Sequence, residues 1–334
     1  MPAEPYAIES LIKAAEKRAA LSQQTEAYRL CNGFYEGLPG LVFDRYGPAL
    51  VILDHTEPGT SDEVVDAAAQ WGMAALEDVE TVLHKQRSHP EENFRRGVCL
   101  AGGYLPKQIS ELGVLYALDL QLHQDASFYL DTRNLRRWLR ENMAGKRVLN
   151  TFCYTGSLGI AAGVGGAAQV VQTDLNAKYL RLARQSWALN QLPTAVCQTV
   201  PGDFFRVVGR MRSQGLLFDC VILDPPFFSA TEAGRVDLLG ETTRLINKVR
   251  PLVAHEGHLV VINNALFLSG ADFMAELDAL CQSPYIELET TLPVPPDVTG
   301  YPETVITPPP TDPKPFNHPT KIAILKMMRK DGRQ

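Results

Sequence analysis

The sequence has few cysteines, and they lie far apart. No CxxC pair and no paired Cys/His spacing occurs among the six, which are residues 31, 99, 153, 197, 220 and 281. This spacing argues against a zinc site and against a disulfide framework, and it fits a reducing cytoplasm. We therefore expect a cytoplasmic protein that binds no metal.

Long apolar runs and a basic excess are missing as well. No stretch is long and uncharged enough to span a membrane, and the N-terminal residues 1–5 lack the basic region and apolar core of a secretory signal. The formal net charge is −6, so any contact with nucleic-acid phosphate would need a local basic patch. We expect no membrane partner, and nothing in the sequence indicates the oligomeric state.

The chain is long enough for two domains, because 334 residues can bury two cores. An N-terminal helix is expected within residues 1–27. Residues 28–106 read as a small α+β domain, in which glycine and proline punctuate short apolar strands. Residues 107–334 form the larger domain.

Strands and helix-length stretches alternate in the larger domain, which predicts right-handed βαβ units and a mainly parallel sheet. The fold class is therefore α/β, with a Rossmann-like domain after a small α+β domain. Two late strands are expected to pair at an edge of the sheet. The seven expected strands are residues 148–152, 170–174, 195–200, 220–224, 259–264, 285–292 and 321–328. Residues 293–319, rich in proline, read either as a functional lid or as a disordered connection.

The most informative motif is Asp224-Pro225-Pro226-Phe227, directly after an apolar strand. Two prolines cannot continue a central strand, because they lack the N–H that a ladder needs. The strand must end there and leave a stiff loop at the sheet edge where open α/β sheets bind ligands. A carboxylate, free carbonyls and the rings of Phe227 and Phe228 suit a flat ring that bears an amine.

A glycine turn and two carboxylates accompany this motif. The turn that contains Gly156 would let the backbone approach a ligand, with a helix N-terminus behind it. Asp174 ends the second strand and could accept hydrogen bonds from ribose hydroxyls, or it could cap the next helix. Asp203 could bind an adenine amine while Phe204 packs the ring, and a helix cap is an equal alternative for it.

These features fit NAD and S-adenosylmethionine alike, since both carry a ribose and an adenine. The first turn lacks GxGxxG, and hydride transfer does not require Asp-Pro-Pro-Phe. S-adenosylmethionine is the preferred cofactor on these grounds. The chain is then expected to be a methyltransferase.

Three segments resemble the bacterial large-subunit (23S) ribosomal RNA methyltransferases, a class I family that depends on S-adenosylmethionine. They are residues 28–47, residues 128–137 and the turn at residues 149–156. The resemblance implies an RNA substrate, ribosomal RNA. It also implies a cofactor site, whose expected residues are Asp131, Arg133, Phe152, Tyr154, Thr155, Gly156, Asp174, Leu175, Asp203, Phe204 and Asp224.

The chain departs from the cytosine-C5 branch of that family in two respects. That branch begins with an RNA-binding PUA domain, for which we see no room here. It also carries a cysteine nucleophile after the fifth strand, where this chain has Asn263-Asn264. The asparagine pair resembles the guanine-N7 branch, and a ring nitrogen needs no covalent activation. The expected catalytic residues are Asp224, Pro225, Phe227, Phe228, Asn263 and Asn264.

Three other readings remain open at this stage. The first is cytosine-C5 methylation with a relocated cysteine, Cys153 or Cys220. The second is methylation of a protein amide or a small amine, which the acidic net charge favours. The third is an RNA-binding module that has lost catalysis. The candidate RNA contacts are Lys85, Arg87, Arg95, Arg96, Arg133, Arg136 and Arg137, which would hold phosphate without reading sequence.

Overall fold

The computed structural model describes residues 4–334 and divides them into two compact units. The first unit contains the chain up to Asp131 together with Pro295–Pro309, and the second contains Thr132–Val294 and Pro310–Gln334. The boundary expected at residue 106 therefore falls inside the first unit. Residues 107–131 fold with that unit because Gln108–Glu111 (β6) and Val114–Ala117 (β7) form a hairpin bridged to Thr25.

The first unit is a five-stranded sheet with two helices on one face. The order is β1-β2-β3-β4-β5, and only β3 and β4 are parallel, because α3 crosses between them. Helices α1 and α3 share a core with the sheet. The helix expected within residues 1–27 is α1, although residues 1–3 lie outside the described part of the chain. The elements are α1 (Glu4–Glu16), a 3₁₀ turn (Ala19–Gln23), β1 (Ala27–Asn32), α2 (Gly33–Glu36), β2 (Leu41–Tyr46), β3 (Ala49–Asp54), α3 (Asp62–Ala75), β4 (Thr81–Gln86), α4 (Glu92–Arg96), β5 (Val98–Ala101), β6, β7 and α11 (Pro296–Thr299).

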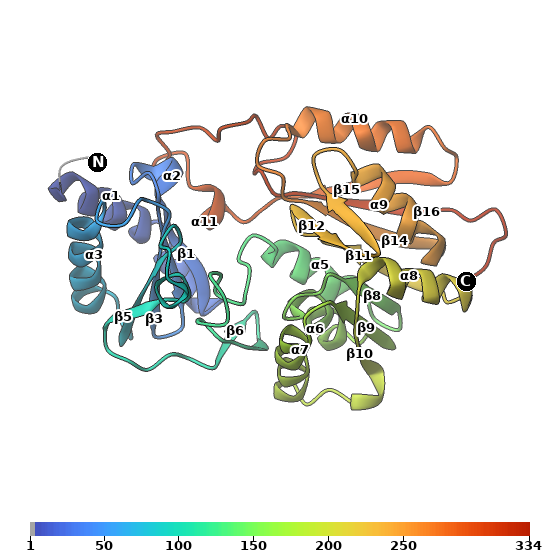
Figure 1. Ribbon diagram of the computed structural model, residues 1–334, viewed down its shortest axis with the longest axis horizontal. Coiled ribbons are helices and arrows are strands. Elements are labelled where there is room, and N and C mark those ends of the chain that lie inside the picture. Colours follow the sequence, from blue (N-terminus) through green and yellow to red (C-terminus); the bar gives the residue numbers. More distant parts are fainter. Residues whose placement is uncertain (1–3) are drawn as a thin grey trace. The chain divides into compact units, whose positions relative to one another are not determined.

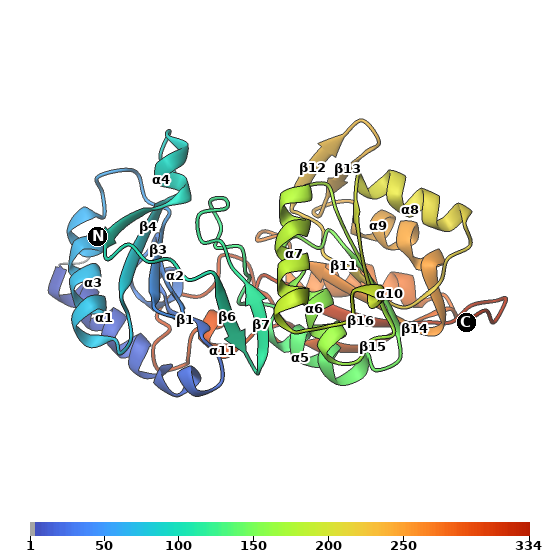
Figure 2. The same ribbon diagram turned by 90° about the horizontal axis from the view of Figure 1, so that it is seen from below.

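The second unit is a seven-stranded α/β domain (Figures 1 and 2), as the sequence predicts. Its strand order is β10-β9-β8-β11-β14-β16-β15, and β16 runs antiparallel to both of its neighbours. Helices α8, α9 and α10 pack on one face of the sheet. The elements are α5 (Arg133–Asn142), β8 (Arg147–Thr151), α6 (Ser157–Val164), β9 (Gln169–Asp174), α7 (Ala177–Leu189), β10 (Cys197–Pro201), α8 (Phe204–Ser213), β11 (Phe218–Leu223), β12 (Phe228–Thr231), β13 (Gly234–Asp237), α9 (Thr242–Val249), β14 (Val253–Asn263), α10 (Gly270–Cys281), β15 (Ile286–Leu292) and β16 (Lys321–Met327), with 3₁₀ turns at Thr194–Val196 and Arg250–Leu252.

The sheet of the second unit reverses its strand order between β8 and β11. Strands β9 and β10 follow β8 on one side, whereas β14, β16 and β15 follow β11 on the other. In open α/β sheets such a switch point leaves a crevice at the carboxyl ends of the strands, and ligands bind there. The fold therefore places the expected ligand site where β8 and β11 end.

The proline-rich connection at residues 293–319 is neither disordered nor free of the rest of the chain. Its residues 295–309 pack within the first unit, where Ile306 N–H donates to the Tyr35 carbonyl at 2.8 Å. Further along, Phe316 joins the core beneath α10, and Gly270 N–H donates to the Asp312 carbonyl at 2.9 Å. The connection thus contributes one stretch to each unit.

Candidate active site

The adjacent strands β9, β8 and β11 end at the same level of the sheet. Thr151 of β8 pairs with Thr173 of β9 and with Leu223 of β11. The next residues along the chain, Phe152, Asp174 and Asp224, therefore leave the sheet side by side. The alternation of strands and helices predicts this juxtaposition, and the register establishes it.

The turn between β8 and α6 has an unusual backbone. Phe152 and Tyr154 adopt φ values of 51° and 50°, and Gly156 adopts 84°. Non-glycine residues rarely hold a left-handed conformation, and they do so mostly where surrounding structure fixes them for function. Here Cys153 N–H donates to the Thr173 carbonyl at 3.0 Å, and Gly156 N–H to the Cys153 carbonyl at 2.7 Å. The result is a rigid loop that presents backbone groups to the crevice.

Asp174 holds this loop in place. One of its carboxylate oxygens accepts from Tyr154 N–H at 2.9 Å and the other from Asn176 N–H at 2.9 Å. Burial raises the pKa of the carboxyl group, although the backbone hydrogen bonds oppose the shift. Asn176, not Asp174, caps α7 by accepting from Lys178 N–H. A carboxylate has about four lone-pair sites, so the Asp174 side chain can still accept a hydrogen bond from a ribose hydroxyl.

Asp203 takes the alternative role of a helix cap. It accepts from Arg206 N–H at 3.1 Å at the start of α8, and from the Thr231 hydroxyl at 2.6 Å. The expected contact between Asp203 and an adenine amine stays a prediction. The amine would donate to the same carboxylate oxygens that already accept from Arg206 and Thr231. Beside it, the buried ring of Phe204 stacks on Phe152, with 4.4 Å between ring centroids and 27° between planes. This pair forms an aromatic layer that joins the first turn to α8.

The remaining expected cofactor residues differ in burial. Thr155 is buried and Leu175 is 65% exposed at the end of β9. Tyr154 meets Tyr179 edge to face, with 4.6 Å between centroids. Asp131 and Arg133 fall in different units, because the boundary lies between residues 131 and 132. Their expected place beside the cofactor remains a prediction.

The double-proline corner has the expected form. Strand β11 ends at Leu223, Asp224 is half-buried and Pro225 is buried, whereas Phe227 and Phe228 are 44% and 57% exposed. The sequence did not indicate the hairpin that follows, in which β12 and β13 pair from Phe228 opposite Asp237 to Thr231 opposite Gly234. Gly234 is a small residue at the start of β13, and the structure explains it: an added Cβ there would lie 2.5 Å from the Phe205 ring. The hairpin makes Phe228 the first residue of an ordered element.

The two asparagines after β14 have different surroundings. Asn263 is fully buried; its amide donates to the Leu238 carbonyl at 3.2 Å and the Thr242 hydroxyl at 3.1 Å, and its oxygen accepts from Ala265 N–H at 2.9 Å. These bonds tie β14 to the segment that follows the hairpin. Asn264 is exposed at the edge of the sheet. Of the two, Asn264 is the one that could touch a substrate.

A buried lysine lies at the same edge, and sequence reasoning missed it. Lys321 begins β16 opposite Asn263, and its ammonium donates to the carbonyls of Ala265 at 3.1 Å and Pro319 at 2.5 Å. Desolvation lowers the pKa of this amine to about 8. A charged residue directly before the apolar run at residues 322–325 was the available signal. Lys321 fixes the backbone next to Asn264.

Several of the expected RNA contacts are engaged elsewhere. Lys85 is fully buried, and its ammonium donates to the carbonyls of Arg96, Leu120 and His123 at 2.5–2.9 Å. It cannot reach RNA in this conformation, so that prediction is wrong. Nothing in the sequence indicated that the Lys85 side chain would hold residues 96, 120 and 123 together.

The arginines in that set also fall into two groups. Arg87 pairs with Asp125 at 2.7 Å, and Arg95 donates to the carbonyls of His89 and Pro90. Arg133 and Arg136 are buried, whereas Arg96 and Arg137 are exposed. Of the last two, Arg96 also donates to the Gln121 carbonyl at 2.7 Å and lies 3.9 Å from Glu92.

The thiols near the site are poorly placed for covalent catalysis. Cys220 is fully buried in β11, and Cys153 is 7% exposed. Burial raises the pKa of both thiols. A nucleophilic cysteine must be accessible and present as thiolate, and neither residue meets those conditions.

Within residues 4–334, no group of three His, Cys, Asp or Glu side chains is arranged to hold a metal ion. In the same part of the chain, no helix combines the length and apolar character that crossing a bilayer requires.

A family profile and curated relatives match this chain. The profile, described as S-adenosylmethionine-dependent methyltransferase, matches residues 62–304. Ribosomal RNA large subunit methyltransferase I of Aeromonas hydrophila subsp. hydrophila is 33% identical over 243 residues, which are 68% of this chain and 59% of that protein. YwbD of Bacillus subtilis, named as a candidate ribosomal RNA large subunit methyltransferase, is 28% identical over 287 residues, 83% of this chain and 71% of YwbD. The chain thus spans less than two thirds of the first relative, and the expected resemblance is confirmed.

A solved structure supports the fold. SMU.776, described as a candidate methyltransferase and solved in complex with S-adenosylhomocysteine (SAH), gives a TM-score of 0.83 at 24% identity over 97% of this chain and 81% of its own. The predicted fold class is confirmed, and the family description confirms the predicted cofactor. With the glycine turn, the Asp174 carboxylate and the double-proline corner at one sheet edge, the chain belongs to the S-adenosylmethionine-dependent methyltransferase family.

Proposed function

We propose that the chain methylates a nitrogen atom of a base in large-subunit ribosomal RNA, with guanine N7 as the preferred acceptor. The observation that carries this proposal is the pair of exposed rings, Phe227 and Phe228, directly after Asp224 at the switch point. Exposed aromatic side chains at the mouth of a crevice suit a base that has left its stack. The relatives named as ribosomal RNA methyltransferases support the choice of RNA.

The residues at the switch point fit S-adenosylmethionine, which would supply an electrophilic methyl group when bound. Asp174 would accept from the ribose hydroxyls, and the Phe152–Phe204 pair would lie against the adenine. At Gly156 an added Cβ would lie 2.6 Å from both Ala183 and Gln172, so the backbone is as close to its neighbours as it can be. A loop built this tightly holds its free groups in one orientation.

A ring nitrogen suits these residues better than a ring carbon. Guanine N7 carries a lone pair, so the protein needs only to place it in line with the methyl group. Methylation leaves that ring positively charged, and the Asp224 carboxylate would stabilise the new charge. Methylation of cytosine C5 would require a thiolate, and Cys153 and Cys220 are both buried.

Methyl transfer to purified large-subunit ribosomal RNA, followed by mass spectrometry of its nucleosides, tests the proposal. We expect one methylated purine that appears only with the protein and the cofactor. Methyl groups on a protein or small amine, with none on RNA, would refute the RNA substrate. Methylated cytosine would refute the nitrogen acceptor.

A second test addresses the covalent route directly. Cys153→Ser and Cys220→Ser should each retain methyl transfer, because neither thiol takes part in the chemistry. Wild-type protein under the same conditions is the control. Complete loss of transfer in a variant that still binds SAH would favour the cysteine mechanism instead.

A further inference from the structure

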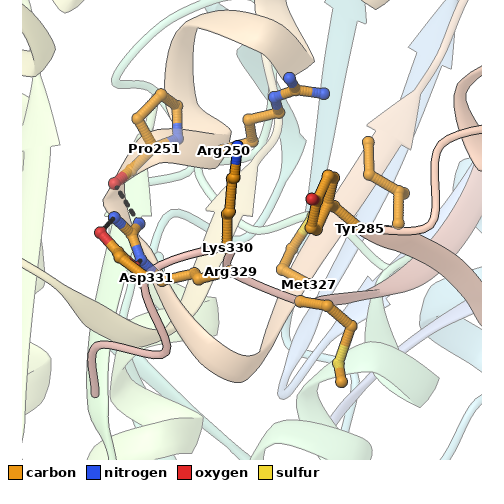
Figure 3. Close-up of a pocket in the computed structure, with 9 residues that line it drawn as sticks. Arg250, Pro251, Tyr285, Met327, Arg329, Lys330 and Asp331 are labelled. Atoms are coloured by element: carbon orange, nitrogen blue, oxygen red, sulfur yellow. Dashed lines mark hydrogen bonds and ion pairs between the residues drawn. The ribbon is translucent and has the colours of Figure 1, made fainter.

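A pocket of about 390 Å³ lies at the opposite edge of the second unit's sheet from the methyl-transfer site. Its walls come from the 3₁₀ turn before β14, from Tyr285 and Ile286 at the start of β15, and from the end of β16 with the residues that follow it (Figure 3). Because Gly257 pairs with Met327 and Asn263 with Lys321, six residue steps of strand separate the two edges. At the usual rise per residue this is about 20 Å.

The pocket and its neighbour are strongly cationic although the chain carries a net charge of −6. A second depression, of about 440 Å³, shares Pro251 and Arg329 with the first. Together they are lined by one carboxylate, Asp331, and five cationic side chains: Arg212, Arg250, Arg329, Lys330 and Arg333. This cluster is the kind of local patch that an acidic protein needs to bind phosphate.

Three of these cations are available to a ligand. Asp331 is shared by Arg329 and Arg333, each at 2.8 Å. Arg212, Arg250 and Lys330 are exposed, and no ion pair or side-chain hydrogen bond involves them within residues 4–334. Their charges are therefore not offset by neighbouring carboxylates.

The pocket is also preformed. Arg329 donates to the carbonyls of Pro251 at 2.9 Å and Val253 at 3.1 Å, and Figure 3 shows it with Asp331 on one side of the pocket. Its own N–H donates to His255 at 3.0 Å, and Met328 N–H donates to the Tyr285 carbonyl at 2.9 Å. These bonds fix the backbone before Lys330, and beyond it His255 N–H donates to the Arg333 carbonyl at 2.8 Å.

An exposed aromatic ring completes the pocket. Tyr285 is 41% exposed and lies across the pocket from the Arg329–Asp331 pair, with Lys330 between them in the view of Figure 3. Cationic side chains that follow a phosphate backbone, together with an aromatic ring on which a base can stack, are the features of single-stranded nucleic-acid sites.

We propose that this pocket binds an unpaired segment of the RNA substrate, with phosphates on Arg250 and Lys330 and a base on Tyr285. The proposal rests on the proposed RNA substrate and adds a second contact to it. A separation of about 20 Å corresponds to about six stacked nucleotides at 3.4 Å per nucleotide. The segment therefore flanks the methylated base and does not include it.

A charge-removal experiment tests the phosphate contacts. Binding of a fluorescent 12-nucleotide oligouridylate is measured by anisotropy at several salt concentrations, for wild type and for the double variant Arg250→Gln, Lys330→Gln. We expect at least tenfold weaker binding at low salt and a salt slope smaller by about 1.4, since each lost single-strand phosphate contact removes about 0.7. The matched control is Lys13→Gln, Lys107→Gln, which removes two exposed lysines of the first unit and should bind like wild type.

The aromatic contact has its own pair of variants. Tyr285→Ala should weaken oligouridylate binding about fivefold or more, whereas Tyr285→Phe should bind like wild type, because stacking needs the ring and not the hydroxyl. Calorimetric titration with SAH should give the wild-type affinity in every variant, which shows that the fold and the cofactor site are intact.

The readouts separate this inference from the proposed function. If wild type methylates ribosomal RNA and the double variant binds RNA with the wild-type affinity and salt slope, the pocket proposal is overturned and the function stands. If wild type transfers no methyl group to RNA, the proposed function fails, and oligouridylate binding by the variants still decides the pocket. In the supporting case, KM for ribosomal RNA rises in the double variant far more than kcat falls.

Discussion

At the scale of single residues, Gly156 and Asp174 act together although they follow different strands. The turn needs a left-handed glycine, and Asp174 holds that turn through Tyr154 N–H. Burial at this position disfavours the charged form of the Asp174 carboxylate and raises its pKa. A charged group kept where burial disfavours it is typical of a binding site.

Gly156→Ala should abolish measurable SAH binding. The new Cβ would lie 2.6 Å from Ala183 and Gln172, and the backbone has φ of 84°. The control is Gly145→Ala, which shares a positive φ (71°) but has open space around the new Cβ. That variant should lose only about 1–2 kcal/mol of stability and bind SAH normally. Equal SAH affinity of the two variants in calorimetric titration would contradict this account of the turn.

The two asparagines should have different roles, Asn263 in stability and Asn264 in methyl transfer. Asn263→Ala should lower the free energy of unfolding by about 2–3 kcal/mol, because it removes three buried hydrogen bonds. Asn264→Ala should leave stability within about 0.5 kcal/mol of wild type and reduce methyl transfer. Urea unfolding and an activity assay check this, and a reversed pattern would move the proposed contact to Asn263.

The lowered pKa of Lys321 predicts that the stability of the protein depends on pH. Its pKa of about 8 lies below the ordinary 10.5, so between these values the unfolded state binds more protons than the folded state. The stability of wild type relative to Lys321→Met should therefore rise by roughly 2 kcal/mol from pH 7 to pH 10. Denaturant unfolding at both pH values measures the difference. A constant difference would mean that the amine titrates alike in both states.

The sequence was most informative where chemistry follows directly from a strand. Asp174 and Asp224 could be placed at the carboxyl edge, because each stands at the end of an expected strand. Lys85 and Lys321 could not be placed, since their burial depends on carbonyls contributed by other segments. A buried lysine and an exposed one look alike in a single sequence.

At the scale of elements, the connection at residues 295–309 is held by a buried ion pair. The Arg18 guanidinium donates to Glu36 at 2.9 Å and to the Asp297 carbonyl at 2.9 Å, and all three residues are buried. Thr304 donates to the other carboxylate oxygen of Glu36. These contacts order a proline-rich segment that has no hydrophobic periodicity.

Arg18→Met should lower the free energy of unfolding by about 3–5 kcal/mol, because it leaves the buried Glu36 carboxylate without a positive charge to pair with. Adding Glu36→Gln should recover part of that loss. Lys17→Met is the control, since Lys17 pairs with Glu303 at 3.6 Å at the surface and should cost less than about 1 kcal/mol. Hydrogen exchange should increase within residues 295–309 in the first variant alone, and unchanged exchange there would contradict the role given to Arg18.

The elements differ in how well local pattern predicts them. The strands of the parallel sheet contain short apolar runs, and their positions follow from the sequence within about two residues. The exception is β14, which begins at Val253, six residues before the expected start. The β12–β13 hairpin is short and mostly exposed, so it lacks any apolar alternation that could identify it. The order in residues 295–309 comes in part from Arg18 and Glu36, which lie more than 250 residues away in the chain.

At the scale of the whole molecule, the chain combines an acidic net charge with two local surfaces that suit RNA. The exposed rings at the carboxyl edge of the second unit's sheet would receive a base, and the cationic pocket at its amino edge would hold a phosphate backbone. The single formal charge of −6 hides this uneven distribution. The acidic composition alone is therefore compatible with the proposed RNA substrate.

The most direct test of the central claim is the structure of the protein bound to SAH. The account predicts that the ribose hydroxyls lie within hydrogen-bond distance of Asp174, that the adenine lies against the Phe152–Phe204 pair, and that the sulfur faces the corner at Asp224 and Pro225. A complex in which that corner is closed off from the sulfur, or in which SAH occupies another part of the chain, would contradict it.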